Sequence, residues 1–293
     1  MVGAGGVQLC SDTARVIWIK LLSDPSAIAT VKQVCKAWHD HAVKAYAGAV
    51  KLKAFSSVEA LAKFTSASKL DCRDVQWLTN DDLRRIPELM PSLRRIDISG
   101  CQHVSSVGVK AFVKRMGVRL LAFAQGTTPK YWLCKEMRVT DATTTLMADR
   151  YAPGLEELSL TLGSKVKKFG GLSGHRSLRS LTISFEGFTP LYLPPSLPAL
   201  RELTIKTSDF SVFPWPKARP DLRFASLNYP MLELLTIDNH AEEGWGTCPL
   251  TRDFVVAWST IFPNATVRVI HAGRLSDIKT LPFMVQNGLV MSS

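Results

Sequence analysis

The sequence predicts an α/β solenoid, in which short repeats build a curved parallel sheet with helices or irregular turns on its outer side. Segments with the pattern apolar-x-x-apolar-x-apolar recur along the chain, and capped amphipathic stretches lie between several of them. A separate helical pattern precedes the first repeat. One such strand cannot bury its apolar face alone, so the segments are expected to stack into one continuous core behind a helical cap.

The chain begins with a segment unlike the rest. Residues 1–10 are expected to be a flexible terminus, and residues 11–46 a helical motif. Five apolar residues follow Pro25 at offsets of three, six, nine, ten and thirteen, which trace one side of a helix. These residues are Ile28, Val31, Val34, Cys35 and Trp38.

Residues 47–240 carry the repeats, whose starts lie 22 to 37 residues apart. The last two apolar residues of each segment are two apart and therefore point to the same side of a strand. In the segment VRLLAF, this frame assigns Val118, Leu121 and Phe123 to the core. The other clear segments begin at Leu93, Leu155, Leu178, Leu200 and Leu232, and weaker ones lie at Val50/Leu52 and Leu70/Cys72.

Three stretches between the segments predict outer helices. The first opens at Thr79 and is stopped by Pro91, and the second spans residues 104–117, with serines at its start and a glycine at its end. The third opens at Thr140/Asp141 and ends at Pro153-Gly154. Between residues 172 and 239 the connectors are shorter and proline-rich, which predicts irregular turns.

The stretch from Leu93 to Cys101 reads Leu-x-x-Leu-x-Leu-x-x-Cys, and small polar residues open a helix after it. Residues 78–117 therefore resemble the cysteine-containing subtype of leucine-rich repeat. This resemblance implies that Cys101 lies in the turn after the strand. Residues 241–293 are expected to form a C-terminal capping unit, with a helical stripe between Phe254 and Phe262 and a final strand in TVRVIHA.

The strings PSAI and VCKAW, at residues 25–28 and 34–38, resemble the second half of an F-box, which reads Pro-x-x-Leu and then Val-Cys-Lys-x-Trp. An F-box followed by leucine-rich repeats is a known architecture. The resemblance implies binding to the Skp adaptor of Skp–cullin ubiquitin ligases. The Leu-Pro pair that usually starts an F-box is absent, and capping of the repeat core is the second interpretation. The implied adaptor-binding residues are Ile19, Leu22, Pro25, Ile28, Val31, Val34, Cys35 and Trp38.

Composition narrows the classes of function. The formal net charge of +11 favours acidic partners, and nucleic-acid binding is an alternative that rests on this charge alone. The six cysteines lie far apart and are expected to be reduced and mostly buried, and neither a metal site nor a cofactor is expected. With no long apolar run, signal-peptide pattern, phosphate loop or nucleophile elbow, the sequence favours a cytoplasmic or nuclear protein without membrane contact or enzymatic activity.

Function is therefore expected on a surface. The outward positions of the strands predict a concave partner-binding face of small, hydroxylated and mixed-charge residues, and two aromatic insertions offer further anchors. The predicted function is that of a substrate receptor. The chain is expected to be a monomer within a hetero-complex that contains the adaptor, a cullin and an unknown target protein. The alternative is a scaffold subunit of a larger, possibly RNA-containing assembly. The predicted contact residues are Arg95, Asp97, Glu157, Ser159, Thr182, Glu202, Thr204, Lys206, Thr236 and Asp238 on the face, and Tyr131, Trp132 and Trp215 in the loops.

Overall fold

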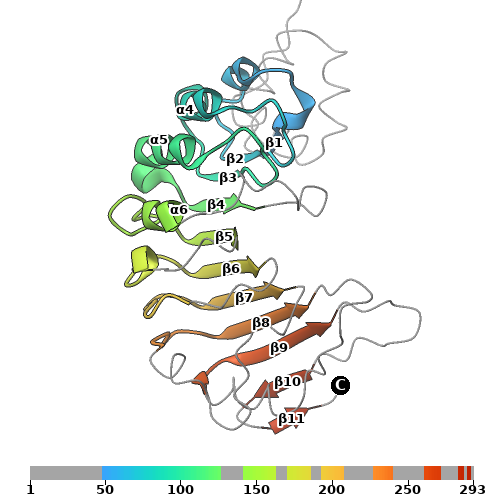
Figure 1. The fold of residues 1–293 in the computed structure, drawn as a ribbon, viewed down its shortest axis with the longest axis vertical. Helices are drawn as coiled ribbons and strands as arrows, with labels where there is room; N and C mark the ends of the chain where they lie inside the picture. Colours follow the sequence, from blue (N-terminus) through green and yellow to red (C-terminus); the bar gives the residue numbers. More distant parts are fainter. Residues whose placement is uncertain are drawn as a thin grey trace, which may run out of the picture.

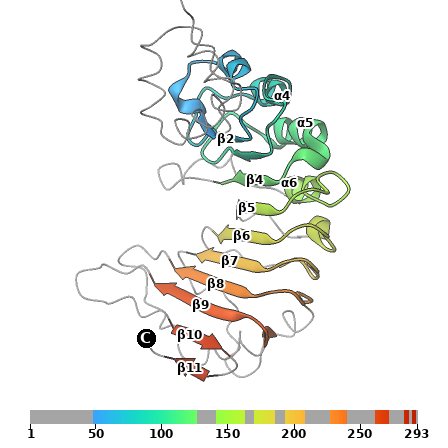
Figure 2. The same ribbon diagram turned by 180° about the vertical axis from the view of Figure 1, so that it is seen from behind.

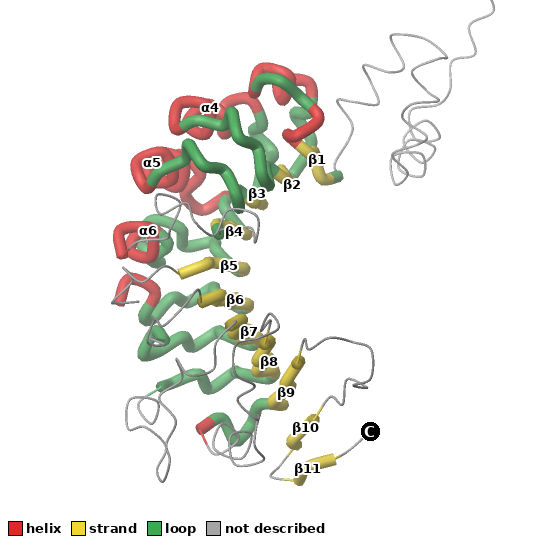
Figure 3. The backbone as a smooth tube through the Cα atoms, turned by 45° about the vertical axis from the view of Figure 1, so that its right-hand side comes forward, coloured by secondary structure: helices red, strands yellow, loops and turns green. Residues whose placement is uncertain are grey.

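A computed structural model describes residues 48–126, 141–162, 170–185, 193–207, 227–239, 261–271, 283–286 and 289–291. Over these residues the chain forms one eleven-stranded sheet, in which β1 to β11 follow one another in chain order. The strands are stacked in one column, with β1 near the top and β11 at the bottom (Figure 1), and the same column is seen from behind in Figure 2. The helices lie on the outer side of an arc whose inner side is lined by strands (Figure 3). The predicted α/β leucine-rich-repeat solenoid is confirmed.

The strands from β1 to β9 pair in parallel, β10 pairs antiparallel with β9, and β11 pairs antiparallel with β10. The apolar C-terminal tail thus adds two strands to the last parallel one. The strands are β1 Ala49–Lys51, β2 Lys69–Asp71, β3 Arg95–Asp97, β4 Ala122–Gln125, β5 Glu157–Leu162, β6 Ser180–Phe185, β7 Glu202–Thr207, β8 Leu234–Asn239, β9 Thr266–His271, β10 Phe283–Gln286 and β11 Leu289–Met291.

The core is a ladder of apolar side chains, one from each parallel strand, held in register by the pairing of the sheet. Every member is at most 3% exposed. Burial of each such side chain contributes roughly 1.5–3 kcal/mol, and the ladder is continuous because each rung covers the next. The members are Val50, Leu70, Ile96, Phe123, Leu158, Leu181, Leu203, Leu235 and Val267.

The predicted frame of VRLLAF is wrong by two residues at its start. Val118 is 70% exposed, whereas Leu120 is fully buried. The reason is a 3-10 turn, Gly117–Arg119, which continues the chain beyond the preceding helix and closes with a hydrogen bond from the Leu120 amide to the Gly117 carbonyl. The repeat therefore reads Leu120-x-x-Phe123-x-Gln125, with Gln125 at a position that is aliphatic in the neighbouring repeats.

The outer helices begin where their capping residues predict. Helix α4 (Asn80–Leu89) has a capping box between Thr79 and Asp82, and α5 (Ser106–Met116) has Ser105 as its N-cap. The third predicted helix is shorter than expected, because α6 (Asp141–Leu146) ends after six residues and turns follow it. The β-branched threonines in its sequence favour a helix weakly, which accounts for this early end.

A buried histidine connects two successive repeats behind the sheet. His175 is fully buried, its Nε2 lies 3.1 Å from the Ala152 carbonyl, and its Nδ1 accepts from the Ser177 amide at 3.3 Å. A carbonyl can only accept and an amide N–H can only donate, so these contacts fix the neutral ring with its proton on Nε2. Burial lowers the pKa of His175 below its ordinary value of 6.5.

This environment predicts a pH-dependent stability. Because the folded-state pKa is depressed, the contribution of His175 is complete above the unfolded value of 6.5 and is lost as the pH falls from there through the folded value. Wild type should lose more free energy of unfolding between neutral pH and about pH 5 than His175→Gln, measured by urea denaturation. The matched control is His103→Gln at an exposed position. Equal pH slopes for wild type and His175→Gln would contradict the assignment.

Candidate protein-binding face

The outward side chains of the strands form regular rows, because the parallel strands pair residue by residue without a shift. The structure brings all ten predicted contact residues onto this concave face. The first row is Lys69, Arg95, Ala122, Glu157, Ser180, Glu202 and Leu234; the second is Asp71, Asp97, Ala124, Ser159, Thr182, Thr204 and Thr236; the third includes Ser184, Lys206 and Asp238.

The rows contain a hollow over the N-terminal half of the sheet, with a volume of about 390 Å³. Its floor lies over β4, where both outward residues are alanines, Ala122 and Ala124. The flanking strands carry longer side chains, so β4 forms a depression between them. The polar side chains around it are Lys69, Asp71, Arg95, Asp97, Glu157, Ser159, Ser180 and Thr182.

One ion pair crosses this hollow. Arg95 Nη1 on β3 lies 2.5 Å from Glu157 Oε2 on β5, and the two side chains meet above Ala122 of the strand between them. A third of the Arg95 side chain and half of that of Glu157 are exposed. At this exposure the pair contributes about 0–1 kcal/mol to stability. Its main consequence is positional, because it holds both charged ends over the alanine floor.

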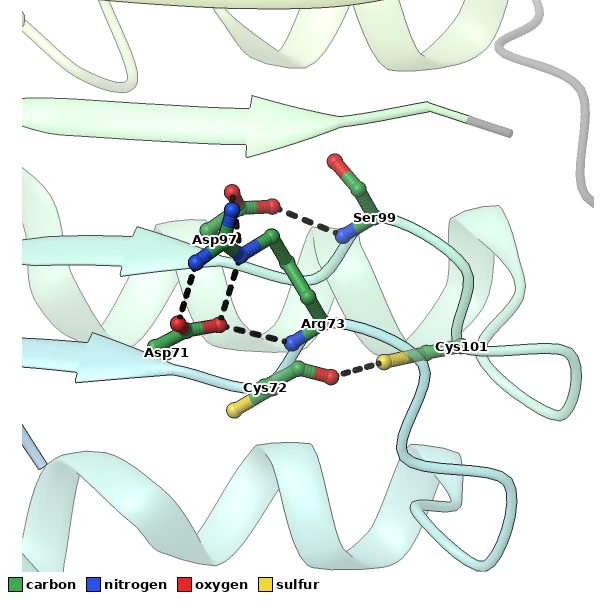
Figure 4. A network of polar contacts seen from close by, with 6 residues as sticks. All are labelled: Asp71, Cys72, Arg73, Asp97, Ser99 and Cys101. Carbon is green, nitrogen blue, oxygen red and sulfur yellow. Dashed lines mark hydrogen bonds and ion pairs between the residues drawn. The ribbon is translucent and has the colours of Figure 1, made fainter. Parts of the chain in front are cut away.

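A second polar network lies at the carboxyl ends of β2 and β3 (Figure 4). Arg73 donates to both carboxylate oxygens of Asp71, at 2.7 and 3.0 Å, and its backbone amide donates to the same carboxylate at 3.0 Å. These hydrogen bonds hold the pKa of Asp71 below its usual range and raise that of Arg73. Asp97 accepts from the Ser99 amide at 2.9 Å and lies 3.7 Å from Arg73 Nε.

The cysteine turn below this network is structural. Cys101 lies in the turn after β3, as predicted, and its Sγ donates to the Cys72 carbonyl at 3.0 Å (Figure 4). Both thiols are buried, and burial raises the pKa of Cys101 to about 12 and that of Cys72 well above its usual value. Protonated thiols are poor nucleophiles and poor metal ligands, so the pair has the properties of small packing residues.

At the C-terminal end of the face, two of the predicted contact residues are largely buried. Thr236 and Asp238 are only 8% and 7% exposed, and Lys206 Nζ lies 3.9 Å from Asp238 Oδ2. These two β8 residues therefore offer a partner little surface. Glu202 of β7 is exposed and accepts a hydrogen bond from Ser180 Oγ at 3.4 Å. The accessible functional groups thus concentrate between β2 and β7.

Two charged residues of the hollow, Lys69 and Asp71, were not among the predicted contacts, and neither was Arg73, which pairs with Asp71 beyond the end of β2. Lys69 and Asp71 flank Leu70, whose repeat is the weaker candidate Leu70/Cys72, and the alternation used for the later strands would have identified both. Arg73 lies beyond the strand, outside any pattern that alternation can detect. The predicted adaptor-binding residues and the loop residues Tyr131, Trp132 and Trp215 lie outside the described residues.

The described part of the chain holds neither a candidate metal site nor a membrane-spanning helix. There, no cluster of three or more histidine, cysteine, aspartate or glutamate side chains is arranged to hold a metal ion. Within the same ranges no helix has both the length and the apolar character needed to cross a membrane.

Comparison with known proteins gives matches of structure only. No family model and no curated sequence matches the chain. A chain of the yeast Rad7–Elc1 complex is 14% identical, with a TM-score of 0.36 and coverage of 92% of this chain and 90% of that one. A Bacteroides fragilis protein is 14% identical, with a TM-score of 0.36 and coverage of 72% and 54%. TLR13, in complex with the single-stranded RNA ssRNA13, is 14% identical, with a TM-score of 0.38 and coverage of 83% and 32%. This chain thus spans about half of the second protein and a third of the third.

Proposed function

We propose that the chain is a non-catalytic interaction protein of the cytoplasm or nucleus that serves as the substrate receptor of a Skp–cullin–F-box ubiquitin ligase. In this proposal the F-box-like segment, residues 11–46, binds the Skp adaptor, and the concave face binds a target protein. The observation that carries the proposal is the concave face itself, an in-register array of polar side chains on a rigid strand ladder. Side chains fixed in this way recognise a partner with little loss of conformational entropy.

The chemistry of the face supports a protein as its ligand. The hollow carries both signs of charge, with Arg95 beside the carboxylates of Asp97 and Glu157, and the second row continues with the hydroxyl groups of Ser159 and Thr182. A nucleic-acid backbone would require several arginines or lysines along its path. Paired carboxylates and protonated thiols provide neither a free base nor a nucleophile, which supports a binding role without catalysis.

The adaptor part of the proposal is tested by co-expression. The chain is produced with a Skp adaptor and analysed by size exclusion, as wild type and as the double variant Val34→Asp, Trp38→Ala. The matched control is Lys32→Ala, His39→Ala, on the other side of the same predicted helix. Wild type and control should co-elute with the adaptor, whereas the double variant should not. Val34→Asp places a charge in the apolar contact, and Trp38→Ala removes an aromatic anchor from it.

The alternative function predicts a different result. If wild type does not co-elute with the adaptor, the receptor proposal fails, and a scaffold subunit with an F-box-derived cap becomes the better explanation. RNA binding by such a scaffold would appear as an affinity that falls steeply with added salt. An affinity that is independent of salt would argue against an RNA-containing assembly.

A further inference from the structure

Two cations of the concave hollow lie next to each other. Lys69 and Arg95 are direct neighbours in the first row, on adjacent strands about 4.8 Å apart. Like charges placed opposite each other in a sheet destabilise it unless an anion lies between them. Among the described residues the carboxylate that pairs with this row is Glu157, and it lies on the far side of Arg95 from Lys69.

The three carboxylates around the hollow are already engaged. Asp71 accepts three hydrogen bonds from Arg73, Asp97 accepts from the Ser99 amide, and Glu157 pairs with Arg95. Lys69, by contrast, is exposed and has no carboxylate within ion-pair distance among the described residues. With Arg73 counted, three cations and three carboxylates surround the hollow, and Lys69 is the one cation among them without an ion-pair partner in the described residues.

Arg95 also has donors to spare. Its guanidinium group presents five N–H donors, and the contact with Glu157 is made through Nη1. The remaining N–H groups and the Lys69 ammonium can both donate to one carboxylate placed between β2 and β3. The floor of Ala122 and Ala124 leaves room beside this position for the backbone of the same ligand.

We infer that the concave hollow binds an acidic side chain, Asp or Glu, of an extended segment of the target protein, with its carboxylate between Lys69 and Arg95. This inference rests on the proposed function and specifies what the face recognises. The formal net charge of +11 attracts an acidic segment at long range. A phosphate chain fits less well, because Asp71, Asp97 and Glu157 line the same hollow and repel a polyanion.

The test uses a random peptide library displayed on phage and selected against the full chain. A selected peptide is synthesised with its acidic residue intact and with Asp→Asn or Glu→Gln, and the dissociation constants are measured by fluorescence polarisation. Removal of the acid should weaken binding to wild type about tenfold. The same removal should have no further effect on Lys69→Gln, Arg95→Gln, because the partner charge is already absent.

Two controls separate charge from folding. Lys110→Gln, Lys114→Gln makes the same change of net charge on exposed positions of α5 and should bind like wild type. Lys69→Gln alone leaves the Arg95–Glu157 pair intact and should still weaken the acidic peptide, with an unchanged thermal unfolding curve. Ser159→Arg fills the hollow and reports whether a peptide binds there at all.

The outcomes distinguish this inference from the proposed function. Peptides that are blocked by Ser159→Arg but insensitive to Lys69→Gln, or that carry Lys or Arg instead of an acid, overturn the acidic ligand and leave a binding face. Peptides unaffected by Ser159→Arg overturn the concave face as the binding surface. A selection that yields no binding peptide also overturns the inference. So does an RNA oligonucleotide that displaces the peptide with an affinity that falls steeply with added salt. The co-elution with the Skp adaptor is a separate measurement, and none of these outcomes changes it.

Discussion

Leu120→Ala should lower the free energy of unfolding by about 2–5 kcal/mol, the largest effect that we expect from a single substitution in this chain. Leu120 is fully buried and precedes β4, whose Phe123 is a rung of the core ladder. Truncation removes apolar contacts and leaves a cavity between the two neighbouring repeats. Because stability in a solenoid includes the interface between neighbours, the loss should spread beyond one repeat.

The matched control is Val118→Ala, two residues earlier in the same segment. Val118 is 70% exposed, so this substitution should change stability by no more than about 0.5 kcal/mol. Urea denaturation followed by circular dichroism measures both variants. A large loss for Val118→Ala together with a small one for Leu120→Ala would restore the frame that the sequence predicts and contradict the structure of β4.

The segment VRLLAF is the one clear repeat whose frame the apolar pattern does not determine. The repeat frame was correct wherever one phase alone placed aliphatic residues in the core, as in β5 to β8. In VRLLAF both Leu120 and Leu121 are apolar, so two phases compete, and the pattern cannot tell them apart. The 3-10 turn of Gly117–Arg119 decides between them through backbone hydrogen bonds that the apolar pattern does not encode.

The sequence likewise predicts only part of the candidate site. Alternation along the strands placed Arg95, Asp97 and Glu157 on one face, because neighbouring side chains in a strand point to opposite sides. The hollow was not predicted, because alternation places Ala122 and Ala124 outward in either frame but does not show that longer side chains of the neighbouring strands surround them. The neutralisation of Asp71 by Arg73 was also missed, because it depends on the path of the turn beyond β2.

Gly100→Ala should destabilise the fold by more than about 2 kcal/mol, because two separate costs coincide at this turn. The residue has φ +77°, a conformation that costs a residue with a side chain about 1–2 kcal/mol. A Cβ atom would also lie 2.2 Å from Asp74 Oδ1 and 3.2 Å from the Asp74 backbone nitrogen. The turn therefore cannot relax by a rotamer change alone, and overpacking of this kind typically costs 1–3 kcal/mol.

Gly174→Ala isolates the first cost from the second. Gly174 has φ +79°, and a Cβ atom there would meet nothing within 4 Å. It should therefore lose only the conformational part, about 1–2 kcal/mol. The difference between the two variants in urea denaturation then measures the packing of the Gly100 turn against Asp74. Equal losses would mean that the turn at Gly100 does not pack closely against the turn at Asp74. The Cys101–Cys72 hydrogen bond joins these same two turns. The alignment of β2 with β3 beside the concave hollow would then need revision.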